Sequence, residues 1–314
     1  MTEPLLPDGL IGVWATVGAV VNVALVLLVA PFLQGVQRRI TARVQSRRGP
    51  PLLQPYFDLL KLLGKEDLEA GEAPAVQRLA AYLSLASVLA VACFVPLGFA
   101  APLWPAGDVI LLVYLLLLSG VCTLLAGAAA GSTYSWVGVS REMMSMMALE
   151  PILAVALGVG AVHARSFRLP DVLNGSPYAA ALPVSGVVML VVMALAFQAF
   201  AGRVPYDVAE AETEIMDGPL SEYSGQKLAL FRLAQMVKLV VYSGLFVGLF
   251  VPWGSGLPFP LAFLAFWAKA FVLVILVALV AATHARYRVD QAIRRYAALL
   301  AVSVGAIILA AFGR

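Results

Sequence analysis

Charged residues are scarce in this sequence of 314 residues, since Asp, Glu, Lys and Arg together make up 12% of it. Soluble domains usually carry about 25% charged residues. Hydrophobic residues account for 62% of the chain. This composition excludes an ordinary soluble protein and predicts a polytopic membrane protein.

Cysteine and histidine are also scarce, with two of each. Cys93 and Cys122 lie inside apolar runs, which argues against a disulfide framework, a thiolate metal site and an iron–sulfur cluster. His163 and His284 lie near opposite faces of the expected membrane region, so they cannot bind one haem together. The sequence also lacks a dinucleotide-binding glycine motif and a phosphate-binding loop. We therefore predict a chain with no cofactor, metal or redox centre of its own, and with no nucleic-acid partner.

Long apolar runs dominate what is present. A transmembrane helix needs about 20 apolar residues, and eight stretches qualify. These are residues 10–34, 79–101, 108–131, 145–164, 182–201, 229–251, 261–283 and 296–313. The first run exceeds the core of a signal peptide, so we expect a retained span. The sequence thus predicts an all-α fold, with residues 1–314 forming a single integral membrane domain of about eight transmembrane helices in the bilayer.

The basic residues are divided unevenly between the two faces of this domain. The loops after the first, third, fifth and seventh spans hold fifteen Lys and Arg, and the opposite face holds three. By the positive-inside rule, the odd-numbered loops face the cytoplasm. We expect a multi-pass protein of the inner (plasma) membrane with both termini outside.

The first cytoplasmic loop contains an amphipathic segment, "LLQPYFDLLKLLGKED", residues 52–67. Its polar residues recur at spacings of four, three and four, which place them on one face of a helix. A helix this short should lie in the membrane interface and not span the bilayer. It either has no partner or forms a docking surface for another subunit. That surface would comprise Arg47, Arg48, Gln54, Asp58, Lys61 and Lys65.

The third cytoplasmic loop is unusually acidic. In "RVPYDVAEAETEIMDGPLSEYSG", residues 203–225, six of the eighteen acids of the chain fall within sixteen positions. If residues 206–216 are helical, four of the carboxylates line one face, and Gly218-Pro219 then ends the helix. Such a row is a solvated loop, or it meets a basic partner, or it handles protons or cations.

Ionisable residues also occur within the predicted spans, where each costs about 2.5 to 3.5 kcal/mol. Glu150, Lys238 and Lys269 are of this kind, and Glu142 lies at the cytoplasmic mouth of the fourth span. Gln235, Lys238 and Tyr242 should share one helix face. Any one of these charges is explained by a structural ion pair. Together they favour a hydrated polar path through the bundle.

Three motifs carry a resemblance to a known family: "RRGPPLLQPYFDLLKLLGKED" (47–67), "SREMMSMMALEP" (140–151) and "RVPYDVAEAETEIMDGPLSEYSGQKLALF" (203–231). They resemble subunit 1 of complex I and its relatives in the group 4 membrane-bound nickel–iron hydrogenases, including the formate hydrogenlyase type. The sequence looks closer to the hydrogenase branch, because "RRGPP" runs straight into "LLQP".

The resemblance implies a membrane subunit that anchors a redox arm. Its partners would be an iron–sulfur small subunit and a hydrogenase-like large subunit on the cytoplasmic face, holding the iron–sulfur and nickel–iron centres, together with antiporter-like membrane subunits. Glu142 and Glu150 would line the path inward, with Lys238 as relay or counter-charge. The coupling-loop acids would be Asp207, Glu210, Glu212, Glu214, Asp217 and Glu222.

Three functional hypotheses remain at this point. The leading one is a cofactor-free subunit of an ion-translocating, multisubunit hydrogenase that couples electron transfer to proton or sodium movement. The second keeps the family and adds a quinone site, in an NADH-type or ferredoxin-type quinone oxidoreductase. The third, from a different class, is a stand-alone ion transporter.

Overall fold

The computed structural model describes residues 8–68, 71, 73–173, 183–254 and 256–313. Within these ranges the chain is helical and forms no β-strand, apart from an isolated bridge between Asp108 and Arg168. The predicted all-α class is confirmed.

Seven of the described helices are long and apolar enough to cross a membrane. They are α1 (Asp8–Val44), α3 (Pro74–Phe94), α4 (Val109–Ala130), α5 (Thr133–Ala164), α10 (Gly225–Phe250), α11 (Phe259–Thr283) and α12 (Val289–Ala311). A further apolar helix, α8 (Val184–Phe200), has 17 residues and is shorter. These helices correspond to the eight predicted stretches, and the protein is a polytopic membrane protein.

Two helices run at least ten residues farther than the predicted spans. Helix α1 continues to Val44, past the predicted limit at residue 34, and α5 begins at Thr133 instead of residue 145. The extensions contain Gln, Arg, Glu and Met, which are good helix formers. The predicted limits follow the apolar runs, because they come from hydropathy. A helix continues beyond such a run until residues of low helix propensity or a capping residue end it.

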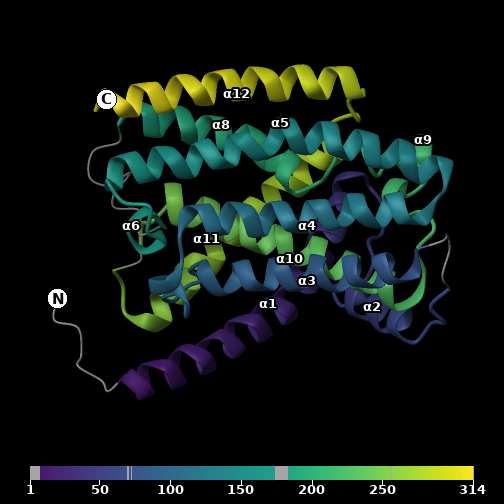
Figure 1. Ribbon diagram of the computed structural model, residues 1–314, viewed down its shortest axis with the longest axis horizontal. Coiled ribbons are helices and arrows are strands. Elements are labelled where there is room, and N and C mark those ends of the chain that lie inside the picture. Colours follow the sequence, from purple (N-terminus) through teal and green to yellow (C-terminus); the bar gives the residue numbers. More distant parts are fainter. Residues whose placement is uncertain (1–7, 69–70, 72, 174–182, 255, 314) are drawn as a thin grey trace.

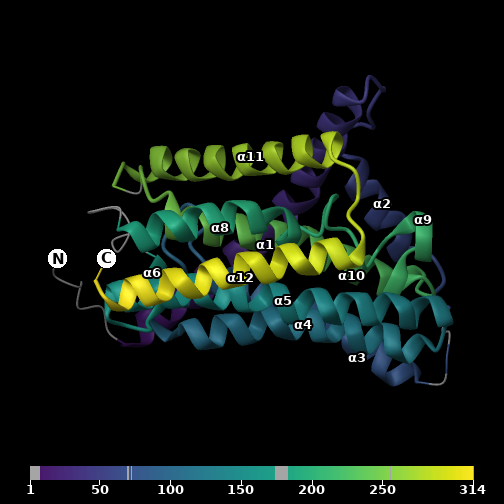
Figure 2. The ribbon, with the colours of Figure 1, turned by 90° about the horizontal axis from the view of Figure 1, so that it is seen from above.

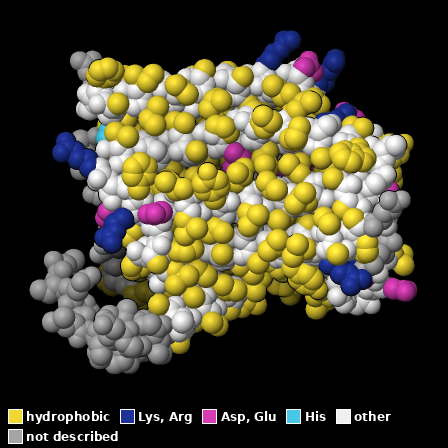
Figure 3. Space-filling model, viewed as in Figure 1, with side chains coloured by type: hydrophobic (Ala, Val, Ile, Leu, Met, Phe, Trp, Pro, Cys, Tyr) yellow, Lys and Arg dark blue, Asp and Glu magenta, His cyan; other side chains and the backbone are white. Residues whose placement is uncertain are grey.

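Helix α10 forms the centre of the bundle, and the other long helices lie around it, with α1 crossing at a tilt (Figures 1 and 2). In its most apolar stretch 83% of the residues are buried, against 22 to 50% in the other six long helices. On the face shown in Figure 3, hydrophobic side chains cover most of the middle, and the charged side chains lie mainly near the two ends. This is the surface expected of a protein that lies in a bilayer.

The described start of α1 and the end of α12 lie at the same end of the bundle, which we call the terminal end (Figure 1). Helix α6 (Leu169–Leu173) and the 3-10 helix η1 (Trp104–Ala106) also belong to this end. The opposite end, which we call the loop end, carries α2 (Gln54–Leu63), α9 (Glu212–Ile215) and the 3-10 helix η2 (Gly218–Leu220) (Figures 1 and 2).

The predicted amphipathic helix is present as α2, which packs against α1 and α10. Pro55 occupies its first turn, and the backbone N–H of Gly64 closes its last turn by donating to Leu60 O at 3.1 Å. Four apolar side chains on the helix or directly before it are exposed by 48 to 64%, which suits a surface facing lipid or another chain. These are Leu53, Phe57, Leu60 and Leu63.

Candidate functional site

Residues 201–224 link α8 to α10 at the loop end, and we call them the bridging segment. A continuous helix over residues 206–216, on which the alignment of four acids depends, is not formed, because α9 covers only Glu212–Ile215. The segment is anchored by Tyr206, whose ring stacks on Tyr296 at 5.2 Å and meets Tyr287 edge-on at 5.3 Å. The Tyr287 N–H donates to Pro205 O at 3.0 Å. These tertiary contacts override the helical spacing of the acids.

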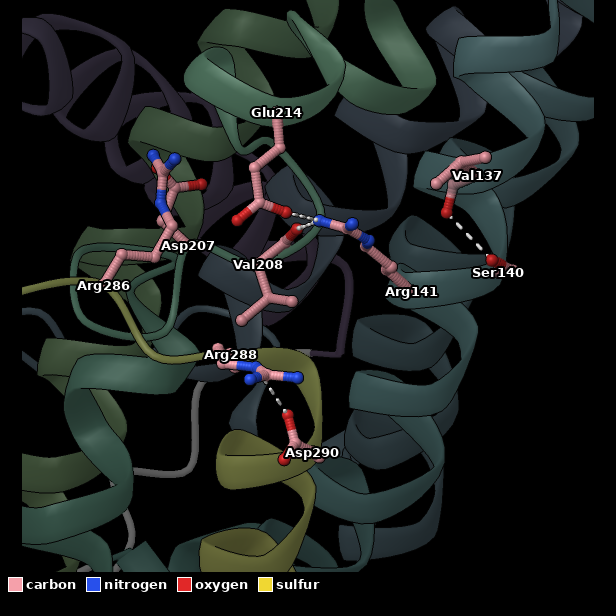
Figure 4. A network of polar contacts seen from close by, with 9 residues as sticks. All are labelled: Val137, Ser140, Arg141, Asp207, Val208, Glu214, Arg286, Arg288 and Asp290. Atoms are coloured by element: carbon pink, nitrogen blue, oxygen red, sulfur yellow. Dashed lines mark hydrogen bonds and ion pairs between the residues drawn. The ribbon is translucent and has the colours of Figure 1, made fainter.

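The acids of the bridging segment do not form one repelling row. Three of them have separate arginine partners on different parts of the bundle, so they do not line the single face that a continuous helix would give them. The pairs are Asp207 with Arg286 at 3.0 Å, Glu214 with Arg141 at 2.6 Å, and Asp217 with Arg232 at 2.7 Å. Figure 4 shows the first two pairs side by side, with Arg141 also donating to the Val208 carbonyl at 3.4 Å.

Glu210 differs from these three acids because its partner is an amide. The side chain of Gln235 in α10 donates a hydrogen bond to the Glu210 carboxylate. Burial raises the pKa of Glu210 from 4.5 to about 7, with Arg232 acting in the opposite direction and Asp207 adding to the rise. Both protonation states are therefore populated near neutral pH. A buried carboxyl group with a pKa shifted in this way is a candidate for a functional role.

The end of the bridging segment is wedged between α4 and α5. Gly218 has a φ of +57°, and an added Cβ would lie 2.0 Å from Ala209 O, so only glycine fits there. Ser135 of α5 donates to Pro219 O at 3.2 Å and to Gly127 O of α4 at 2.7 Å. The predicted break at Gly218-Pro219 is therefore a fixed structural junction.

A cavity of about 140 Å³, which we call the acidic cavity, extends from the bridging segment into the bundle. That volume holds several water molecules. The segment contributes Arg203, Tyr206, Asp207 and Glu210, and the helices contribute Glu142, Glu150, Gln235, Lys238, Tyr242 and Tyr296. The three α10 residues among them confirm that positions 235, 238 and 242 share one face.

The helix residues of the cavity lie well inside the bundle. Glu142 and Glu150 are separated by eight residues of α5, or about 12 Å along the axis. Lys238 lies near the middle of α10 and interacts electrostatically with both carboxylates. The Glu150 Oε2 atom is buried and has no hydrogen-bond partner among the described residues. Such an arrangement of water-sized space, acids and one amine is suited to binding and moving protons.

Other residues singled out in the sequence lie outside this cavity. Lys269 lies at the terminal end and donates to Val251 O at 2.6 Å and Trp253 O at 2.8 Å, so it does not belong to the path. Glu214 and Asp217 lie outside the lining, and Glu222 is exposed. The side chain of Glu212 lies outside the described part of the structure.

The proposed docking residues surround α2. Arg47, Arg48, Lys61 and Lys65 are exposed, whereas Gln54 and Asp58 are partly buried. Asp58 accepts from Arg38 of α1 at 2.7 Å and from Gln54 at 3.0 Å, so it holds α2 onto the bundle. The direct ion pair is thus with Arg38 and not with Lys61.

Sequence reasoning missed several residues of the site. Arg232 precedes Gln235 by three positions on the face of α10 that carries Lys238, and extending the polar stripe by one turn would have found it. Arg203, Arg286 and Tyr296 gave no such signal. They come from separate segments and meet the acids only through the tertiary fold.

The described residues offer little for a metal. They contain no group of three or more His, Cys, Asp and Glu side chains placed to hold a metal ion. Cys93 and Cys122 are 6% and 1% exposed and are not joined to each other.

Comparison with known proteins finds relatives that are named as subunits of hydrogenases and of NADH-quinone oxidoreductases. Residues 17–311 match the family model described as NADH dehydrogenase. Formate hydrogenlyase subunit 4 of Escherichia coli K12 is 36% identical over 276 residues, covering 85% of this chain and 90% of the relative. Hydrogenase-4 component C of the same organism is 36% identical over 258 residues, covering 82% and 81%.

The quinone-linked relatives are somewhat more distant. An NADH-quinone oxidoreductase subunit from Syntrophobacter fumaroxidans is 32% identical over 293 residues, covering 85% of this chain and 86% of the relative. A chain in the structure of the membrane-bound sulfane sulfur reductase, an archaeal respiratory membrane complex, has the same fold, with a TM-score of 0.85 at 22% identity and coverage of 94% and 99%.

The predicted resemblance, including the greater similarity to the hydrogenase branch, is thereby confirmed. The chain belongs to the NADH dehydrogenase subunit 1 family.

Proposed function

We propose that this chain is the cofactor-free membrane subunit of an ion-translocating multisubunit hydrogenase. In this role it anchors the redox arm and couples electron transfer to the movement of protons or sodium ions. The observation that carries the proposal is the acidic cavity, which joins Glu210 of the bridging segment to Glu142, Glu150 and Lys238 within the bundle. The relatives named as hydrogenase subunits support the redox partner.

The redox arm docks on the loop end, which faces the cytoplasm. Its iron–sulfur small subunit and hydrogenase-like large subunit contact α2 and the bridging segment, and antiporter-like subunits lie alongside in the membrane. The partners hold the nickel–iron and iron–sulfur centres.

A change of charge beside the bridging segment alters the proton affinity of Glu210, because its pKa of about 7 depends on burial and on the neighbouring charges of Arg232 and Asp207. A proton gained or lost there changes the field acting on Glu142. Lys238 offsets the negative charge of Glu142 and Glu150. When one of these carboxyl groups releases its proton, the positive charge of Lys238 compensates the buried negative charge that forms. The lining of the cavity supports this sequence of charge changes within one water-sized space.

The test uses the native complex with Glu210→Gln, Glu150→Gln or Lys238→Met, and with Asp171→Asn as a matched control. Asp171 is an exposed acid of α6 at the terminal end. We expect all four complexes to assemble with nickel and iron, and the three cavity variants to lose tenfold or more of coupled ion movement during H₂ turnover. Normal coupling in all three cavity variants, or a complex without nickel, would overturn the proposal.

A quinone-reducing complex is the second candidate, favoured by the 32% identity to an NADH-quinone oxidoreductase subunit. The same preparation distinguishes the two. Quinone reduction that a site-directed inhibitor abolishes, without H₂ evolution, would favour the second candidate. H₂ evolution without quinone reduction would exclude it. Ion uptake by the isolated chain in liposomes would instead point to a stand-alone transporter.

A further inference from the structure

A second cavity lies beside the acidic cavity, between α1 and α11 at the loop end. We call it the basic cavity, and its volume is about 540 Å³. Arg203 and Asp207 line both cavities. Nothing in the proposed coupling path uses the remainder of its lining.

Two buried amides of α1 line the basic cavity, and each has one atom without a partner among the described residues. Gln34 and Gln37 are 7% and 6% exposed, and both line the cavity. The Oε1 of Gln34 and the Nε2 of Gln37 have no hydrogen-bond partner among the described residues. Leaving a buried polar atom unsatisfied is strongly unfavourable, so buried polar groups in folded proteins usually have a partner. A ligand that satisfies both atoms must donate a hydrogen bond to Gln34 Oε1 and accept one from Gln37 Nε2.

The excess of positive charge around the cavity indicates that the hydrogen-bond acceptor on the ligand is an anionic group. Arg38, Arg47, Arg48 and Arg203 line it, against the single acid Asp207. The charge of Asp207 is offset by Arg286 at 3.0 Å, and that of Arg38 by Asp58 at 2.7 Å. Among the described contacts Arg48 has no ion pair, whereas Arg203 interacts electrostatically with Glu210 and Asp207. Guanidinium groups bind phosphate oxygens with paired, charge-assisted hydrogen bonds. A phosphate group fits this set of donors.

The depth and the far wall of the cavity specify the rest of the ligand. Gln34 directly follows the apolar run of α1, so the cavity lies where the hydrocarbon region meets the headgroups. The opposite wall is apolar and comes from Val277, Ala278 and Ala281 near the end of α11. A free anion would leave this wall against water, whereas an acyl chain covers it. Basic pockets between transmembrane helices are a recognised form of anionic lipid site.

We infer that the basic cavity binds an anionic glycerophospholipid whose headgroup carries a hydroxyl, as in phosphatidylglycerol. The phosphate accepts from Gln37 Nε2 and from the arginines at the rim, and the headgroup hydroxyl donates to Gln34 Oε1. This inference does not depend on the proposed function. It concerns a structural ligand held next to the bridging segment.

The test is native mass spectrometry of the purified, delipidated complex titrated with phosphatidylglycerol, with phosphatidylcholine of the same acyl chains, or with inorganic phosphate. We expect phosphatidylglycerol to bind at least tenfold more tightly than phosphatidylcholine. Arg48→Gln should weaken this binding about fivefold, the effect of one arginine near a membrane surface. Gln37→Leu should weaken it as well, by removing the donor.

Arg43→Gln is the matched control, because Arg43 is an exposed arginine of α1 outside the lining. It should leave the affinity unchanged. Since Arg48 is exposed, its variant keeps the test valid even if Gln37→Leu fails to fold. Equal binding of the two lipids, equal loss in Arg43→Gln and Arg48→Gln, or phosphate binding as tightly as the lipid would overturn the inference. Displacement of the lipid by a quinone at equal concentration would also overturn it.

Discussion

Glu210 links the outer and inner charges of the site, and its protonation should be visible in the stability of the protein. Its pKa is raised from 4.5 to about 7, mainly by burial. Between these values the folded chain holds a proton that the unfolded chain has released. The free energy of unfolding therefore falls as the pH rises from about 5 to about 7 and levels off above that range. Glu210→Gln should remove this decrease.

Thermal unfolding of the purified complex at about pH 5 and about pH 8 checks this prediction. Glu222→Gln is the control, because Glu222 is an exposed acid of the same segment. It should keep the wild-type pH dependence. An unchanged pH dependence in Glu210→Gln would mean that the carboxylate of Glu210 remains ionised throughout.

Gly218 provides a second residue-scale prediction, because its backbone conformation and its surroundings both require glycine. An added Cβ would lie 2.0 Å from Ala209 O at a φ of +57°. Gly202, in the same segment, has a φ of +59° with nothing within 4 Å of its added Cβ. Gly202→Ala should therefore cost about 1 to 2 kcal/mol from backbone strain alone. Gly218→Ala should cost at least about 2 kcal/mol more because of the clash. Denaturant or thermal unfolding of the two variants measures the difference, and equal losses would contradict the wedged position of η2.

At the level of elements, the long helices were predictable and the bridging segment was not. A bilayer satisfies no backbone hydrogen bonds, so an apolar run such as residues 261–283 has one stable form, and α11 matches it. The spacing of the acids in residues 206–216 also favoured a helix. There, Tyr206 stacks on Tyr296 and the Tyr287 N–H bonds to Pro205, and no local pattern encodes these contacts.

The attachment of α2 rests on Asp58, which gives an element-scale prediction. Although burial raises the pKa of Asp58, hydrogen bonds from Gln54 and Arg38 lower it more, so the pKa lies below its ordinary value. This contribution to stability is therefore present at neutral pH and is lost when the pH falls through the lowered pKa. Asp58→Asn should make the amide hydrogens of α2 exchange about two- to fivefold faster, as expected for a partly exposed pair.

Hydrogen exchange read by mass spectrometry on peptides from α2 provides the measurement. Lys61→Gln is the control, since Lys61 is exposed on the same helix and takes no part in the hydrogen bonds that Asp58 accepts from Arg38 and Gln54. Exchange that increases equally in α2 and in α10 would show a global loss of stability and would contradict a local role for the pair.

At the level of the whole molecule, the loop end joins segments that are distant in the chain. Arg38 meets Asp58, Arg141 meets Glu214, and Asp207 meets Arg286. Each pair connects two different elements of the loop end. Because the bridging segment borders both cavities through Arg203 and Asp207, a lipid in the basic cavity would also adjoin the acidic one.

The orientation of the whole molecule is a prediction from the excess of basic residues on the odd-numbered loops, which favours a cytoplasmic loop end. Single cysteines test it, because the native Cys93 and Cys122 are 6% and 1% exposed and should react slowly. Glu222→Cys, at the loop end, should react with a membrane-impermeant maleimide in inverted vesicles and not in intact spheroplasts. Phe312→Cys, 78% exposed at the terminal end, should show the opposite pattern. The reverse pattern for both positions would move the bridging segment, and with it the docking site of the redox arm, to the outer face.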